Sequence, residues 1–132
     1  MPSLYSRKIL VADSDCSLTK IYQYYLKKFG FNTVSVHDGQ NLVDAVHNDP
    51  LIYLVMMETV LPVLDGYSAA RQIKQYDADI SIIALTTNVI SAAENDKRCF
   101  DAYLVKPFSM LSFLNAVKDC SFTGLEKRMS PP

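Results

Sequence analysis

Residues 51–66 read LIYLVMMETVLPVLDG, and the rest of the predicted fold is arranged around this segment. Seven consecutive apolar residues, from Leu51 to Met57, predict a strand that is buried on both faces of a sheet. Glu58 follows where that strand should end, and a loop containing Pro62 and Gly66 leads into the next helical pattern. Open α/β sheets place their binding sites at the carboxyl ends of central strands. Glu58 is therefore the first candidate for a site residue.

Four more segments predict strands. Three are short apolar runs, and the fourth, residues 32–36, alternates polar and apolar residues as a less buried strand near the sheet edge does. The predicted strands are residues 9–12, 32–36, 51–57, 80–85 and 102–105. Helical spacing of apolar residues or helical propensity marks the segments between and after them, which are residues 18–29, 42–46, 67–76, 89–98 and 110–117. Strands that alternate with helices predict an α/β fold with a doubly wound, five-stranded parallel sheet.

Chain length and composition limit the classes of protein to which this sequence can belong. The 132 residues suffice for one domain with one core, and 49% hydrophobic with 20% charged residues is ordinary for a soluble globular protein. The net charge of -1 gives no overall attraction to nucleic acid or to an anionic membrane. Three cysteines at unrelated spacings, together with the lack of a secretory signal or a long apolar span, predict a reducing, cytoplasmic location.

Polar residues end four of the predicted strands. They are Asp13, Glu58, Thr86 and Lys106. Because the carboxyl ends of parallel strands meet at one edge of the sheet, an acid pair, a hydroxyl and an ammonium group should gather there. The topology alone predicts a site at this edge.

The same residues carry a resemblance to a known family. Residues 9–13 (ILVAD), 61–66 (LPVLDG), 83–88 (IALTTN) and 103–108 (YLVKPF) resemble, in order and at suitable spacing, the motifs of the receiver domains of two-component response regulators. The resemblance covers residues 7–119 and implies a flavodoxin-like (CheY-like) fold with strand order 2-1-3-4-5. Residues 120–132, where the helical pattern is lost, are expected to be a tail or a linker.

The resemblance also implies a role for each acid at the site. Glu58 stands at the position of the aspartate that accepts a phosphoryl group, and Ser14 stands where the family has the second acid of a metal-binding pair. The implied metal site consists of Asp13, Glu58 and the backbone carbonyl of Thr59. Asp15 is expected to point away from the pocket. Since Mg²⁺ demands near-ideal oxygen geometry, the loss of a carboxylate predicts weak binding of Mg²⁺ or none, and no other cofactor is expected.

The remaining motif residues correspond to the family's switch. Thr86 occupies the position of the switch hydroxyl, Tyr103 that of the switch aromatic and Lys106 that of the lysine that contacts the phosphoryl group. The family implies contact with a histidine kinase or another signalling protein through the face of the fourth helix, the fifth strand and the fifth helix, where a homodimer could also form. Direct binding of nucleic acid or of a membrane is not expected.

The sequence is compatible with three functions. The first is a degenerate receiver (a pseudo-receiver) that is not an enzyme and acts by protein–protein contact, with phosphorylation lost or impaired. The second is a working, Mg²⁺-dependent phosphoacceptor that uses Glu58. The third is a flavodoxin-like cofactor-binding domain, which the lack of a glycine-rich phosphate loop after Val11 disfavours.

Overall fold

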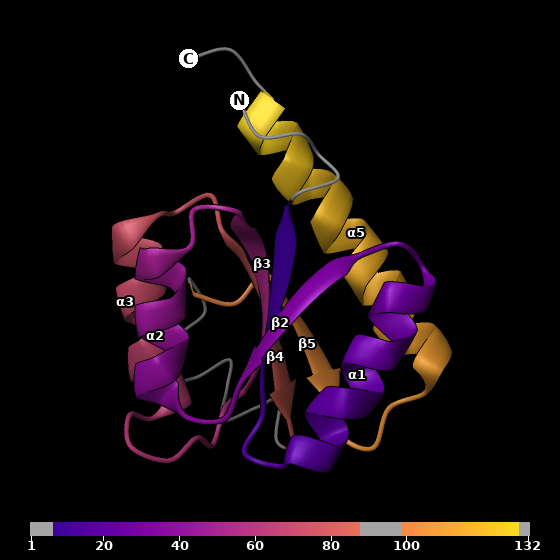
Figure 1. The fold of residues 1–132 in the computed structure, drawn as a ribbon, viewed down its shortest axis with the longest axis horizontal. Helices are drawn as coiled ribbons and strands as arrows, with labels where there is room; N and C mark the ends of the chain where they lie inside the picture. Colours follow the sequence, from indigo (N-terminus) through magenta and orange to yellow (C-terminus); the bar gives the residue numbers. More distant parts are fainter. Residues whose placement is uncertain (1–6, 88–98, 130–132) are drawn as a thin grey trace.

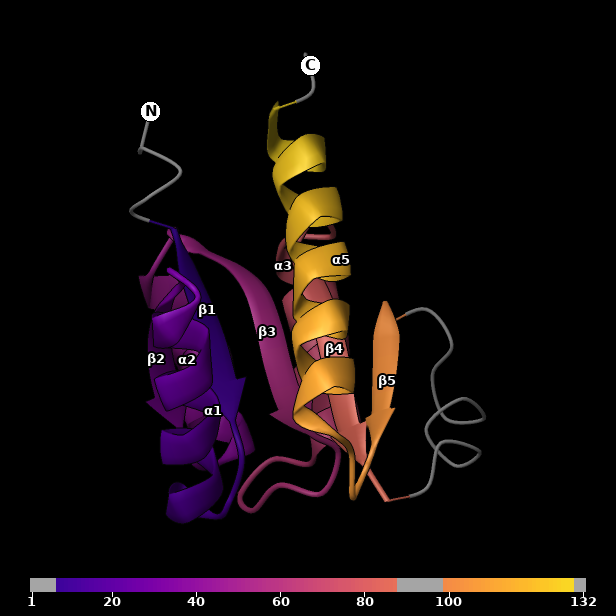
Figure 2. The same cartoon turned by 90° about the vertical axis from the view of Figure 1, so that its right-hand side faces the viewer.

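The computed structural model describes the backbone of residues 7–87 and 99–129, and side chains over residues 7–87 and 99–121. Five parallel strands form one sheet in the order β2-β1-β3-β4-β5, which confirms the predicted topology. The strands are β1 Lys8–Ala12, β2 Asn32–Val36, β3 Ile52–Glu58, β4 Ser81–Thr86 and β5 Ala102–Val105, and the helices are α1 Cys16–Lys28, α2 Gly39–Asn48, α3 Gly66–Tyr76 and α5 Met110–Met129. Helices α1 and α5 cover one face of the sheet, and α2 and α3 cover the other (Figures 1 and 2).

Strand β3 is the centre of the core, as its sequence predicts. Its first six residues are buried, and Glu58 is its last, partly exposed residue. Successive side chains of a strand point to opposite faces. Val55 and Met57 accordingly pack toward α2 and α3, whereas Leu54 and Met56 pack with Phe113 of α5. Burial on both faces therefore explains why this segment has no polar residue before Glu58.

Aspartates begin three of the helices. The side chains of Asp15, Asp38 and Asp65 accept hydrogen bonds from the first-turn N–H groups of α1, α2 and α3, at 2.8 Å (Ser17), 2.7 Å (Asn41) and 3.0 Å (Ser68), respectively. These caps satisfy N–H groups that lack a partner within the helix. Asp15 is thus engaged at the start of α1, as expected for an acid that points away from the pocket.

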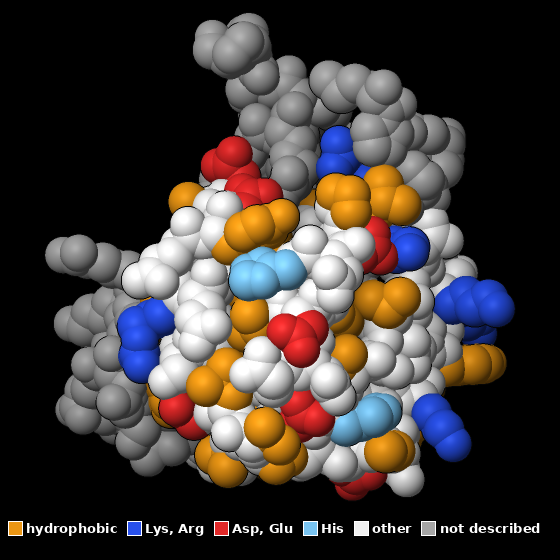
Figure 3. Space-filling model, turned by 60° about the vertical axis from the view of Figure 1, so that its left-hand side comes forward, with side chains coloured by type: hydrophobic (Ala, Val, Ile, Leu, Met, Phe, Trp, Pro, Cys, Tyr) orange, Lys and Arg blue, Asp and Glu red, His pale blue; other side chains and the backbone are white. Residues whose placement is uncertain are grey.

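The loop after β3 packs tightly against the start of α2. The Gly39 N–H donates to the Pro62 carbonyl at 3.1 Å, and a Cβ atom at Gly39 would lie 1.8 Å from the Leu64 carbonyl oxygen. Val63 adopts a positive φ of 71° and is 82% exposed. Figure 3 shows hydrophobic side chains gathered at this end of the molecule, beside acidic ones. The loop is therefore fixed to the start of α2 by backbone contacts.

A polar brace holds the amino ends of β4 and β5 against α3. The Lys74 ammonium donates to an Asp101 carboxylate oxygen at 2.9 Å and to the Ile80 carbonyl at 2.6 Å. The same Asp101 oxygen accepts from the Ile82 N–H at 2.7 Å, and the Asp101 N–H donates to the Ile82 carbonyl at 2.8 Å. One ion pair and several backbone groups thus join three elements at this end of the sheet.

The expectation that helical structure ends near Cys120 is wrong. Helix α5 continues to Met129, and the Tyr53 hydroxyl on β3 lies 2.6 Å from the Ser121 hydroxyl, which is buried. This packing on β3 supports the helix where its sequence periodicity has faded. The division of the chain after residue 119 stays a prediction, and the predicted helix over residues 89–98 lies outside the described residues. Within the described parts, no helix has the length and apolar character that a membrane span requires.

Candidate functional site

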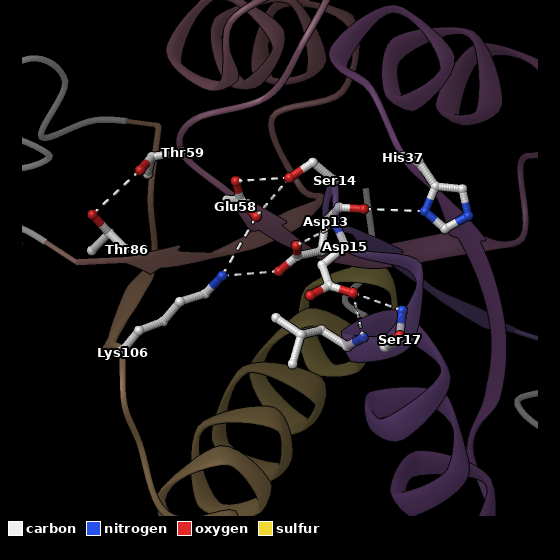
Figure 4. A network of polar contacts seen from close by, with 10 residues as sticks. Asp13, Ser14, Asp15, Ser17, His37, Glu58, Thr59, Thr86 and Lys106 are labelled. Atoms are coloured by element: carbon white, nitrogen blue, oxygen red, sulfur yellow. Dashed lines mark hydrogen bonds and ion pairs between the residues drawn. The ribbon is translucent and has the colours of Figure 1, made fainter.

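Three of the four predicted strand-end residues come together at the carboxyl edge of the sheet. Asp13 follows β1, Glu58 ends β3 and Lys106 follows β5. The Lys106 ammonium donates to Asp13 Oδ2 at 3.0 Å and to Glu58 Oε2 at 3.4 Å (Figure 4). The side chain of Asp13 is only 1% exposed, whereas those of Glu58 and Lys106 are 17% and 22% exposed. We call these three residues the acid–lysine cluster.

Further hydrogen bonds reach the remaining carboxylate oxygens of the cluster. The Ser14 hydroxyl lies 3.3 Å from Glu58 Oε1 and 3.5 Å from Oε2, and it donates to the carboxylate. Asp13 Oδ1 accepts from the Asp15 N–H at 2.9 Å, and the Asp13 carbonyl lies 3.1 Å from His37 Nδ1, which must carry a proton to donate to it. Ser14, which sequence analysis treated only as a missing carboxylate, therefore holds Glu58 directly.

The three ionisable groups of the cluster shift one another's pKa. Burial, followed by a hydrogen bond with Asp13 and the charge of Asp13, raises the pKa of the Glu58 carboxyl from 4.5 to about 7. Burial opposes ionisation of Asp13 as well, but hydrogen bonds with Glu58, the Asp15 N–H and Lys106 together hold its pKa below the ordinary value. Burial would lower the pKa of Lys106, yet the two carboxylates raise it. Near neutral pH the acid pair therefore shares one exchangeable proton.

The fourth predicted residue, Thr86, lies at the same edge in a different pairing. The Thr59 hydroxyl donates to the Thr86 hydroxyl at 3.3 Å, and both residues are 4% exposed. Both threonines, Glu58 and Lys106 line part of one cleft of about 210 Å³. The hydroxyl of Thr59 was missed in the sequence. The sequence did contain a signal for it. Because Glu58 pairs with Leu85 in the sheet, the residues that follow them, Thr59 and Thr86, are neighbours at the ends of β3 and β4.

Two further predicted residues have structural partners. The Thr59 carbonyl, expected as a metal ligand, accepts a hydrogen bond from the Gly66 N–H at 3.2 Å. Tyr103 lies half-buried on β5, and its ring packs edge to face on Phe100 with ring centroids 5.7 Å apart. Phe100 in turn contacts Tyr67 of α3 at 5.9 Å. Tyr103 therefore belongs to a row of aromatic rings on the side of the sheet that α2 and α3 cover.

The oxygen donors of the site are arranged around an internal cation, the Lys106 ammonium. Mg²⁺ binds oxygen ligands in near-ideal octahedral geometry. Over residues 7–87 and 99–121, no three His, Cys, Asp or Glu side chains lie close enough together to hold a metal ion. The two carboxylates of the site already contact the Lys106 ammonium. A metal ion would have to displace or outcompete this internal cation, so the side chains present fit Mg²⁺ poorly.

Comparison with known proteins places this geometry in a family. The sequence model of the response regulator receiver domain matches residues 9–118. The probable transcriptional regulator ycf27 of Guillardia theta is 32% identical over 104 residues, which make up 77% of this chain and only 40% of that protein.

Solved structures give the same answer for the fold. The receiver domain of the sensor histidine kinase PA1611 from Pseudomonas aeruginosa, described with a magnesium ion in its active-site cleft, is 26% identical with a TM-score of 0.77, over 86% of this chain and 96% of that one. The chemotaxis response regulator CheY4 of Vibrio cholerae, at 19% identity, has a TM-score of 0.79 over 86% and 98% of the two chains. The chain therefore belongs to the family of response regulator receiver domains.

Proposed function

We propose that this receiver domain works as a degenerate receiver, in which phosphorylation on Glu58 is impaired and signalling proceeds by protein–protein contact. The observation that carries the proposal is the position of the Glu58 carboxylate, which is held between the Ser14 hydroxyl and the Lys106 ammonium. Both contacts orient the carboxylate and draw electron density from its oxygens, which makes attack on an incoming phosphorus atom less favourable.

Geometry adds a second reason for impaired phosphotransfer. Glutamate is one methylene longer than the aspartate that the family uses, so its oxygens lie farther along the pocket. A displacement of about 1 Å from the productive alignment costs on the order of 10²-fold in rate. Protonation near neutral pH removes further nucleophilic character, since burial and Asp13 raise the pKa of Glu58 to about 7.

Weak binding of Mg²⁺ is part of the same proposal. Lys106 already supplies a positive charge to both carboxylates, and Ser14 contributes a neutral hydroxyl where a carboxylate would add charge. The magnesium ion in the PA1611 receiver shows that the fold can hold the ion in that protein. If the internal cation substitutes for the metal here, direct titration should show no saturable binding of Mg²⁺ at submillimolar concentration.

The proposed partner is a histidine kinase or another signalling protein that contacts β5, α5 and residues 89–98, for which the sequence predicts a fourth helix. On the described part of that face, Val105 is 44% and Leu111 69% exposed. A homodimer through the same face is a further proposal. The chain spans 40% of its regulator relative, so we assign no DNA-binding step and no catalytic turnover to these residues.

Phosphorylation by a small donor tests the proposal. The protein is incubated with Mg²⁺ and acetyl phosphate, and intact mass is measured for the wild type, Glu58→Gln and Glu58→Asp. We expect little adduct on the wild type, some on Glu58→Asp and more when Ser14→Asp is added, because the second change restores a carboxylate for the metal. The single variant Ser14→Asp is the matched control.

Two results would contradict the proposal. A stoichiometric phosphoryl adduct on the wild type that disappears in Glu58→Gln would establish the second candidate function, a working phosphoacceptor. The cleft of about 210 Å³ beside Glu58, Thr86 and Lys106 is the observation that favours that alternative. An absence of any gain in the double variant would show that the phosphorylation pocket lies elsewhere.

A further inference from the structure

Helix α1 presents a row of lysines to solvent. Its sequence, CSLTKIYQYYLKK, contains three lysines and no acidic residue. Lys20, Lys27 and Lys28 are exposed, and they lie on the side of the helix opposite to the buried Tyr22 and Leu26. Within the described part of the chain, no carboxylate lies within ion-pair distance of these lysines. The outer side of α1 is therefore positively charged, although the whole chain has a net charge of -1.

An exposed aromatic ring lies at the centre of these lysines. Tyr24 is 62% exposed, and residues three and four positions away on a helix are its surface neighbours. For Tyr24 these neighbours are Lys20, Ile21, Lys27 and Lys28. Ile21 is itself 45% exposed. One side of α1 thus combines an aromatic and an aliphatic side chain with three cations.

Helix α5 extends the same surface. It lies beside α1 on one face of the sheet (Figure 1), and the Lys118 ammonium of α5 lies 5.4 Å from the centre of the Phe29 ring. Phe29 caps the carboxyl end of α1 and is 50% exposed. Among the described carboxylates, none forms an ion pair with Lys118 either. The basic–aromatic surface, as we call it, consists of Lys20, Ile21, Tyr24, Lys27, Lys28 and Lys118.

The needs of the fold explain only part of this surface. Lys27 and Lys28 lie in the last turn of α1, where the helix dipole favours cations. Lys20 lies about two turns earlier and Lys118 belongs to another helix, so the dipole of α1 explains neither. Tyr24 gains little burial in the core. An aromatic side chain inside a charged rim has the anatomy of a protein contact surface.

We infer that the basic–aromatic surface binds an acidic segment of a partner protein. Apolar residues of that segment pack on Tyr24 and Ile21, and its carboxylates pair with the surrounding lysines. The inference goes beyond the proposed function, because the surface contains no residue of the acid–lysine cluster and none of β5. Binding there requires neither a phosphoryl group nor Mg²⁺.

Two other anionic partners fit this surface less well. A helix that lies in a membrane interface inserts its apolar face, but α1 already buries Tyr22 and Leu26 in the core. Nucleic acid binding draws its affinity from many phosphate contacts, whereas this surface supplies four lysines on a chain of net charge -1. An acidic protein segment needs only a few charge pairs in addition to the apolar contacts with Tyr24 and Ile21.

Titration with defined peptides tests the inference. The ¹⁵N-labelled protein is titrated with a glutamate-rich synthetic peptide that carries spaced leucines, and the backbone amide shifts are followed by NMR. We expect shifts confined to α1 and to the part of α5 around Lys118, and binding that weakens with added salt because exposed charges are screened. The same peptide with lysine in place of glutamate is the matched control. Equal binding of the two peptides, or shifts centred elsewhere, overturns the inference.

Substitutions assign the contacts. The double variant Lys20→Gln, Lys28→Gln should weaken peptide binding about fivefold, as expected for two exposed ion pairs. Tyr24→Ala should weaken it about tenfold, as expected for an aromatic anchor. The matched control is Arg71→Gln on α3, which covers the other face of the sheet, and it should leave the affinity unchanged (Figure 2). Wild-type affinity in both surface variants refutes the inference, and the salt dependence of the wild type decides if a variant does not fold.

Double-stranded DNA and vesicles that contain phosphatidylserine distinguish the class of partner. At the same concentration of negative charge, we expect both to shift the amide signals of α1 less than the acidic peptide does. Stronger binding of the DNA or of the vesicles refutes the assignment to an acidic protein segment. These titrations use no phosphodonor, so their outcome is independent of the mass-spectrometric test of the proposed function.

Discussion

Glu58 should make the stability of this domain fall as pH rises through the neutral range. Its carboxyl is buried beside Asp13, and its pKa is raised from 4.5 to about 7. Between these two values the folded protein keeps a proton on Glu58 that the unfolded chain has released. Folding is therefore linked to proton uptake, and stability decreases with rising pH across this window.

The magnitude follows from the size of the shift. Each unit of pKa difference corresponds to about 1.4 kcal/mol, so the change from 4.5 to about 7 corresponds to an upper bound of about 3 kcal/mol. The partners act outside this window. The lowered pKa of Asp13 contributes stability that is lost only as pH falls below the ordinary value of 3.8, and the raised pKa of Lys106 contributes stability that is lost only as pH rises above 10.5. Glu58 thus dominates the contribution of the cluster between these limits.

Urea unfolding of the wild type and of Glu58→Gln, in the presence of a chelator, measures this contribution. Glutamine imitates the protonated carboxyl and does not titrate, so the difference between the two proteins cancels other titrating groups. We expect the variant to gain stability relative to the wild type by up to about 3 kcal/mol from acidic to mildly alkaline pH. A difference that stays constant across this range would refute the shifted pKa and the shared proton.

Three further substitutions probe other features by urea unfolding. Lys106→Met should destabilise the fold by about 3 kcal/mol, because it leaves the buried Asp13 carboxylate without its cation. Gly39→Ala should cost about 3 kcal/mol, since its Cβ would overlap the Leu64 carbonyl and force the loop away from α2. Val63→Asn should stabilise the protein by about 1 kcal/mol, because asparagine tolerates the positive φ of 71° better than a β-branched residue.

Each of these substitutions has its own contrary outcome. For Lys106→Met, the control is Lys20→Met on the exposed face of α1. Equal losses of stability in the two variants would show that the contacts of Lys106 with Asp13 and Glu58 do not stabilise the fold. For Gly39→Ala, an unchanged midpoint would mean that the loop is not anchored on α2. For Val63→Asn, a loss of stability would show that the exposed valine contributes contacts that outweigh its backbone strain.

The sequence predicts the fold because its strongest local signals agree with the global topology. The apolar run that ends at Met57 can be satisfied only by a strand covered on both faces, and the observed β3 is such a strand. Parallel strands then bring Asp13, Glu58, Thr86 and Lys106 to one edge by topology alone. The position of a strand end is a backbone property, which is why it can be inferred from periodicity and loop residues.

Side-chain pairing at that edge could not be predicted in the same way. Whether Ser14 reaches Glu58, or Thr59 reaches Thr86, depends on rotamers and on differences of a few ångströms between strand ends. The extension of α5 past Cys120 was missed for a related reason. Its support includes the contact between Ser121 and Tyr53, two residues 68 positions apart, and local periodicity carries no information about such a contact.

The contact between Lys74 and Asp101 gives the amino end of β4 a side-chain anchor in addition to its backbone ladder. There the ion pair and the backbone bonds of Ile82 fix β4, β5 and α3 to one another. At the carboxyl end, the Lys106 N–H donates to the Thr86 carbonyl at 2.8 Å, so the backbone ladder holds that end as well. Because the same Asp101 oxygen accepts from both Lys74 and Ile82, one carboxylate sets the register of β4 against β5 and α3 at the amino end.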